Sequence, residues 1–158
     1  MIPSADSFKA AMRRVPSAVA IVGAAHQGER RGLTATAVCS VSAEPPQLLV
    51  CVNKRVRAHD HIRLAGHFGV SYLSQDQGDI AQAFAAPAGA PEDRFRTGDW
   101  TSGSTGAPLL RQALAAFECR VAQAIDCGTH TIYIGEIVAL AQKDDLSLLY
   151  KSGLFSAA

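Results

Sequence analysis

The chain has 158 residues, of which 48% are hydrophobic and 18% are charged, and its formal net charge is +1. This length predicts one domain over residues 1–158, large enough to bury about two thirds of its unfolded surface. The composition lacks the basic character of nucleic-acid-binding proteins and holds no apolar run of membrane-helix length. The first residues show no basic leader before an apolar segment, so we expect a cytoplasmic protein with no nucleic-acid or membrane partner.

The first predicted elements are a short helix and a hairpin. Ser4 or Asp6 is expected to cap a helix that ends before Pro16. A strand is predicted over residues 17–25, and the turn signal at residues 27–30 joins it to the next strand as an antiparallel hairpin.

That next segment, Gly32-Leu-Thr-Ala-Thr-Ala-Val-Cys-Ser-Val-Ser42, is the most informative part of the sequence. Read as one continuous strand, it carries hydroxyl groups on one face, at Thr34, Thr36, Ser40 and Ser42, and small apolar groups on the other. Residues 47–53 are apolar on both faces, which predicts a buried strand. Such a pair can hold a flat, phosphorylated ligand against a sheet. The alternative is that threonine is simply a good strand former and serine is common near turns.

The middle of the chain alternates between helix and strand. A helix is predicted over residues 57–64, a strand over residues 68–74, and a second helix after Ser74, which forms a possible capping box with Gln77. Residues 85–108 show no period and are predicted to be a long functional loop.

The last predicted elements are strands over residues 117–125, 131–140 and 146–150, with a turn at residues 126–128. Six or seven antiparallel strands joined by short turns, with two or three helices, favour a mainly β (α+β) fold. We expect the strands to close into an antiparallel barrel with the helices on its outside.

Several common site motifs are absent from the sequence. No Gly-x-Gly-x-x-Gly follows a strand, so any nicotinamide nucleotide is not held in a Rossmann fold. The four cysteines are not closely paired, and three lie in apolar strand patterns, so we expect buried free thiols. His59 and His61 are two apart on a helix and face different ways, which predicts solvated side chains and no metal site.

The ordered motifs resemble the short-chain NAD(P)H:flavin oxidoreductases, the flavin reductase-like family that serves two-component aromatic monooxygenases. The resemblance covers residues 8–155. It rests on Gly-Leu-Thr-Ala-Thr-Ala-x-Cys-Ser-Val-Ser, Pro-Pro, Leu-Val-Cys-Val-Asn, Arg-Phe, Gly-Ala-Pro-Leu-Leu, Gly-Thr-His-Thr-Ile-x-Ile-Gly-Glu and Leu-Leu-Tyr.

This resemblance implies a six-stranded antiparallel Greek-key split β-barrel with two or three flanking helices, assembled as a homodimer. FMN or FAD is expected near the subunit interface. NADH or NADPH acts as a substrate that stacks on the flavin, donates hydride and leaves, and an oxygenase component then receives the reduced flavin.

The resemblance also assigns site residues. Flavin contacts are expected from Leu33, Thr34, Ala35, Thr36, Ser40, Val52, Asn53, Lys54, Ala58, Ser74, Gln77 and Arg94, with Lys54 or Arg55 adding charge and the helix start near Arg57 favouring an anion. Alternatively, Ser74 and Gln77 form only a helix cap, and Arg94 anchors its loop through an ion pair.

His130 matches the histidine of the family's Gly-Asp-His motif, so the resemblance makes it the catalytic-site contact to the nicotinamide nucleotide. Thr129 stands where the family has Asp, which leaves the protonation of His130 and the choice between NADH and NADPH open. Tyr150 is a second candidate for a nucleotide contact. The rival functions are a flavin-binding module without reductase activity and a split-barrel oxidase or haem-utilisation relative.

Overall fold

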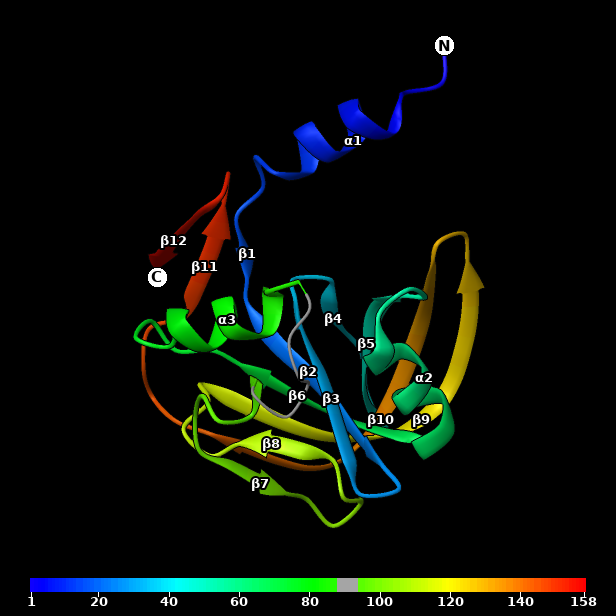
Figure 1. Ribbon diagram of the computed structural model, residues 1–158, viewed down its shortest axis with the longest axis vertical. Helices are drawn as coiled ribbons and strands as arrows, with labels where there is room; N and C mark the ends of the chain where they lie inside the picture. Colours follow the sequence, from blue (N-terminus) through cyan, green and yellow to red (C-terminus); the bar gives the residue numbers. More distant parts are fainter. Residues whose placement is uncertain (88–93) are drawn as a thin grey trace.

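Antiparallel strands make up most of the chain, with three helices in the part that the structure describes (Figure 1). The computed structural model describes residues 1–87 and 94–158, so Asp93 of the expected loop lies outside the described residues. The helices are α1 (Ala5–Met12), α2 (Arg57–Ala65) and α3 (Gly78–Ala85). The strands are β1 (Ser17–Ala18), β2 (Ala20–His26), β3 (Glu29–Ala35), β4 (Val38–Ala43), β5 (Pro46–Asn53), β6 (His67–Tyr72), β7 (Trp100–Ser102), β8 (Pro108–Leu110), β9 (Ala115–Cys127), β10 (His130–Gln142), β11 (Leu148–Lys151) and β12 (Leu154–Ala157).

Seven of these strands form one sheet in the order β3-β2-β6-β9-β10-β5-β4. Its two edge strands, β3 and β4, are consecutive in the chain and are joined by Thr36 and Ala37 alone. Three Cα–Cα steps span about 11 Å at most, so the sheet must curl until its edges meet at this corner. The mainly β antiparallel fold with three helices is confirmed, but no pairing between β3 and β4 closes a barrel in the described residues.

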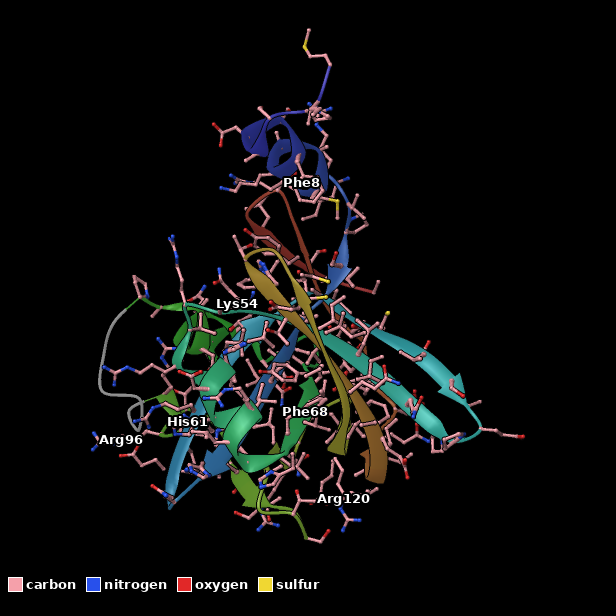
Figure 2. The ribbon with its side chains drawn as sticks, turned by 90° about the vertical axis from the view of Figure 1, so that its right-hand side faces the viewer. Phe8, Lys54, His61, Phe68, Arg96 and Arg120 are labelled. Carbon is pink, nitrogen blue, oxygen red and sulfur yellow. The ribbon has the colours of Figure 1, made fainter. Side chains whose placement is uncertain are left out.

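Because the sheet curls, strands from near both of its edges contribute side chains to one inner core. Side chains from β2 and β3 pack in the same cluster as those from β5, β6, β9 and β10, and Ile62 of α2 joins them. Burial alternates along β5, as expected for a strand with one face toward the core. The strand residues of this core are Ala20, Val22, Ala24, Ala35, Leu48, Val50, Val52, Phe68, Val70, Cys119 and Tyr133, with Phe68 labelled in Figure 2.

A second core lies beneath α3. Ile21 of β2, Phe84 of α3, Leu110 of β8 and Leu148 of β11 belong to it. β2 is therefore buried on both faces over its first five residues. The β7–β8 hairpin falls inside the segment predicted as an irregular loop, because strands of three residues are too short to show a period.

The hydroxyl ladder predicted from Gly32 to Ser42 is wrong as one continuous strand face. The strand breaks at Thr36 and Ala37, where the N–H of Val38 donates to Thr36 O at 3.0 Å. Thr34 consequently lies on one edge of the sheet and Ser40 on the other. Alternation alone could not reveal this break, because a tight turn of small residues preserves the strand-like pattern.

The ends of the chain also differ from the predicted elements. Ser4 caps α1 as expected, accepting a hydrogen bond from the N–H of Ser7 at 3.1 Å. The strand expected over residues 17–25 breaks at Val19, where the chain passes from the β1-β11-β12 sheet into the large sheet. β12 was not predicted; it pairs with β11 and is exposed throughout.

The four cysteines are free, but only Cys119 is buried, and burial raises the pKa of its thiol to about 12. Cys39 and Cys127 are exposed and Cys51 is half-buried, so the prediction of buried thiols is wrong for them. The reason is their placement, because β4 is an edge strand and Cys127 ends β9 beside an exposed turn.

The helix α1 stands away from the rest of the chain (Figure 1). None of its residues is buried, and Phe8 and Met12 expose 62% and 52% of their surface. Across residues 1–87 and 94–158, no helix combines the length and the apolar character needed to cross a bilayer.

A buried carboxylate ties the turn between β7 and β8 to the sheet. Glu118 of β9 is 2% exposed and accepts hydrogen bonds from the N–H of Thr105 and the hydroxyl of Ser104. Gly103 permits this approach, because a Cβ there would lie 2.3 Å from the Glu118 carboxyl carbon. Burial acts to raise the pKa of Glu118, but the hydrogen bonds from Thr105 and Ser104 outweigh it and hold the pKa below its usual value.

We expect Glu118→Gln to lower the free energy of unfolding at neutral pH by about 2 kcal/mol, because the amide cannot accept every bond that the carboxylate accepts. Since folding lowers the carboxyl pKa, its stabilising effect is present above the unfolded value and is lost as pH falls through the folded value. Urea unfolding followed from neutral to acidic pH measures both effects.

The matched control is Glu136→Gln, which changes an exposed glutamate on β10 and is expected to shift stability by less than about 0.5 kcal/mol. The stabilising role of the Glu118 carboxylate is contradicted if Glu118→Gln and the unmodified protein lose the same free energy of unfolding between neutral and acidic pH.

Candidate functional site

The main cavity of the described residues, about 590 Å³, lies along the edge strand β3. Its walls are residues 31–34 of β3, residues 56–58 at the start of α2, residues 84–87 at the end of α3, and Arg94. Among the described residues β3 pairs with β2 alone, so its other edge offers backbone groups to a ligand, although Gly32 O on that edge already accepts from Arg94. The cavity has the size of a small-molecule site.

Close packing between β3 and α3 forms one wall of the cavity. Gly32 allows it, because a Cβ at this position would lie 2.7 Å from Cε1 of Phe84. The hydroxyl of Thr34 donates to Ala81 O at 2.6 Å. Thr34 thus lines the cavity, but its hydroxyl proton is used in the hydrogen bond that holds α3.

Arg94 closes the cavity where β3 and α3 meet. Its guanidinium donates to Gly32 O at 3.2 Å, Phe84 O at 3.1 Å and Ala86 O at 2.6 Å. The expected alternative, an anchor for the loop, is therefore observed, although through backbone carbonyls. The same contacts keep a positive charge at the cavity wall.

Behind this wall lies a cluster of three aromatic rings. Phe84, Phe95 and Trp100 have ring centroids 5.0 to 5.2 Å apart. Trp100 is the single tryptophan of the chain, and it contacts Phe84, which lines the cavity. We therefore expect its fluorescence to respond, through Phe84, to binding in the cavity.

The start of α2 forms the opposite wall and favours an anion. Val56 is the N-cap and offers no side-chain cap, and it lines the cavity together with Arg57 and Ala58 of the first turn. The uncapped N–H groups of a helix start attract negative charge. Arg57 adds positive charge to this lining, whereas the Arg31 guanidinium, also at the cavity, is paired with the Glu29 carboxylate at 2.9 Å. The sequence pattern pointed to Ala58 and to the helix start, but it did not identify the end of α3 as a wall.

α2 is held in place by His59, which corrects the expectation of a solvated histidine. His59 is only 9% exposed, and its Nε2 lies 2.8 Å from the Thr131 hydroxyl. The Tyr133 hydroxyl donates to His59 O at 3.2 Å, and burial raises its pKa, which keeps it protonated. The described residues contain no group of His, Cys, Asp or Glu arranged to hold a metal ion.

A second group of predicted residues meets at the end of β5. Asn53 pairs with His130, the first residue of β10. The Asn53 side chain accepts from the N–H of Arg55 at 2.9 Å, and the Lys54 ammonium donates to Gly128 O at 2.9 Å. His130 is half-exposed, with Nδ1 2.8 Å from the Thr129 hydroxyl. Asn53 and Lys54 precede the cavity wall at Val56 by a few positions, but neither they nor His130 line the cavity.

Three predicted flavin contacts have side chains that point elsewhere. Ala35 and Val52 are buried in the inner core, and Ser40 is exposed on β4 at the far edge of the sheet. Leu33 lines the cavity, and Thr36 is exposed on the link that follows it.

Ser74, Gln77 and Tyr150 are not brought to the cavity. The Gln77 side chain accepts from the N–H of Ser74 at 2.9 Å and donates to Gln112 O at 2.8 Å, which is the structural role considered as an alternative. Only half of the predicted capping box forms, because α3 begins one residue after Gln77. Tyr150 packs its ring on Phe155 of β12 at 5.7 Å.

Comparison with known proteins bears on this site. Residues 12–158 match the family model described as flavin reductase like domain. The chain is 40% identical over 156 residues to the reductase component of FADH(2)-dependent resorcinol hydroxylase of Rhizobium sp. (strain MTP-10005), covering 97% of this chain and 87% of that protein. It is 37% identical over 148 residues to FMN reductase (NADH) RutF of Stutzerimonas stutzeri (strain A1501), covering 94% and 84%.

A solved structure extends the likeness to the fold. NADH:FAD oxidoreductase SgcE6 of Streptomyces globisporus C-1027, in complex with NAD and FAD fragments, aligns with a TM-score of 0.88 and 32% identity. The alignment covers 96% of this chain and 90% of that one.

Proposed function

The chain belongs to the flavin reductase-like domain family, and on that premise we propose that it is an NADH-dependent flavin reductase. In this role it transfers hydride from NADH to FMN or FAD and supplies the reduced flavin to a partner monooxygenase. The observation that carries the proposal is the cavity along β3, which combines a strand edge, an open helix start and three arginines. NADPH as a substrate stays a prediction.

The residues around this cavity fit a flavin. The free edge of β3 at residues 32–34 offers backbone groups to a flat heterocycle, and the start of α2 with Arg57 offers a site for its phosphate. A bound flavin supplies the hydride-accepting ring. The protein contributes binding, orientation and partial exclusion of water, which need no tuned acid or base.

We assign the nicotinamide nucleotide to the side of the cavity where β5 ends and β10 begins. His130 lies there, half-exposed, and Asn53 beside it leads directly into the turn before α2. The His130 imidazole offers Nε2 to a ligand while its Nδ1 contacts the Thr129 hydroxyl. This placement supports the nucleotide role, which binding and kinetics must test.

We also propose that the active form is a homodimer and that the curled sheet is a split barrel. The two-residue link between β3 and β4 and the shared inner core support the barrel. Phe8, Met12 and Leu154 expose 62%, 52% and 73% of their surface, which is typical of a face that a second copy covers. Light scattering should give about twice the chain mass of 16.6 kDa, and a value near one chain contradicts the dimer.

The activity is tested by following NADH absorbance with purified protein and excess FMN, FAD or riboflavin. We expect NADH oxidation that depends on both protein and flavin. FMN is expected to bind about tenfold more tightly than riboflavin, because riboflavin has no phosphate to place at the anion site of α2. No decay beyond the protein-free blank would favour a flavin-binding module, and a protein that holds haem but no flavin would favour the haem relative.

His130→Ala is expected to raise KM for NADH about tenfold and to change flavin affinity less than about twofold, because the residue contacts the nucleotide and does not line the flavin cavity. Steady-state kinetics over a range of NADH, with Trp100 fluorescence as the flavin titration, separates the two effects. Unchanged turnover at every NADH concentration would remove His130 from the site.

A further inference from the structure

The turn between β9 and β10 carries His130 but has little support of its own. It consists of Gly128 and Thr129, between the last residue of β9 and the first of β10. Residues 122–129 are exposed or half-exposed. A histidine in such a position needs an anchor from outside the hairpin if its ring is to meet a substrate in a defined orientation.

Lys54 supplies this anchor through two separate groups. Its backbone N–H donates to Thr129 O at 3.0 Å, and its ammonium donates to Gly128 O at 2.9 Å. The ammonium also forms an ion pair with the carboxylate of Asp126. Figure 2 shows Lys54 close to the tip of the β9–β10 hairpin.

These contacts determine what else the Lys54 ammonium can do. An ammonium has three donors, and the turn uses two of them, on Gly128 and Asp126. Lys54 is absent from the cavity lining, whereas Arg31, Arg57 and Arg94 are all part of it. The positive charge that faces the flavin cavity therefore comes from the arginines.

We propose that Lys54 is a positioning residue for His130, a role that rests on the reductase function proposed above, and that it is not a ligand of the flavin phosphate. The Lys54 ammonium fixes the carbonyl of Gly128, next to Thr129, whose hydroxyl lies 2.8 Å from Nδ1 of His130. The backbone N–H of residue 54 also holds Thr129 O, and this bond survives replacement of the side chain. Thr129 in turn orients the imidazole. Its Nε2 forms no hydrogen bond within the described residues and is left for the nicotinamide nucleotide.

The test is Lys54→Met, with Lys143→Met as the matched control. The two lysine side chains are 35% and 33% exposed and both pair with an aspartate, but Lys143 follows the opposite end of β10. Lys54→Met is expected to raise KM for NADH about fivefold with kcat changed less than about twofold. Affinities for FMN and riboflavin, read from Trp100 fluorescence, should stay unchanged, and Lys143→Met should leave every value unchanged.

Two further variants isolate the route through His130. In a His130→Ala background, Lys54→Met should cause no additional rise in KM, because the residue that it positions is gone. Asp126→Asn should raise KM about twofold, since the Gly128 contact remains. It also provides a second variant if Lys54→Met does not fold.

Each contrary outcome has a distinct meaning. A selective loss of FMN affinity in Lys54→Met, with riboflavin unaffected, would make Lys54 a phosphate ligand and overturn the proposal. An unchanged KM, or a rise that persists without His130, overturns it as well. The NMR signal of the His130 ring tests the anchor without any turnover: it should shift in Lys54→Met and not in Lys143→Met, even if the reductase function itself fails.

Discussion

The two-residue link between β3 and β4 is the constraint on which the rest of the structure depends. It joins the opposite edges of a seven-stranded sheet, so the sheet has to curl. The curl creates the inner core, in which side chains from both halves of the sheet meet. Because the edges approach without pairing, β3 retains a free edge, and this edge becomes the floor of the cavity.

The two helices beside that edge present opposite ends to the cavity, and their electrostatic effects differ. The start of α2 favours an anion, whereas the exposed carbonyls at the end of α3 would repel one. The Arg94 guanidinium donates hydrogen bonds to Phe84 O and Ala86 O, and its positive charge offsets the repulsion of an anion by these carbonyls. A single guanidinium thus binds the wall together and offsets the negative end of the helix.

Much of the fold was predictable from the sequence because alternation and turn residues are local signals. The β2–β3 and β9–β10 hairpins and the capped first helix follow from them. The break at Thr36 could not be predicted, because it depends on how the whole sheet curls to bring its two edges, β3 and β4, together. Of the residues predicted to contact a flavin, Leu33, Thr34, Ala58 and Arg94 line the cavity, and their contact with a flavin stays a prediction. The partners of Arg94 could not be predicted, because they come from segments far apart in sequence. His59 illustrates the same limit, since its burial depends on Thr131, 72 positions away.

The pairing of β5 with β10 has a consequence for the order of folding. Lys54 and Gly128 are 74 positions apart, whereas β9 and β10 are joined by a two-residue turn and need no distant segment to pair. Closing a long loop costs more chain entropy than closing a short one, so pairings between distant segments form late. The β9–β10 hairpin can form early by itself, but the group around His130 is complete only when β5 docks. The residues proposed to meet the substrate are therefore among the last to reach their places, and on the ribosome they cannot do so before most of the chain has been made.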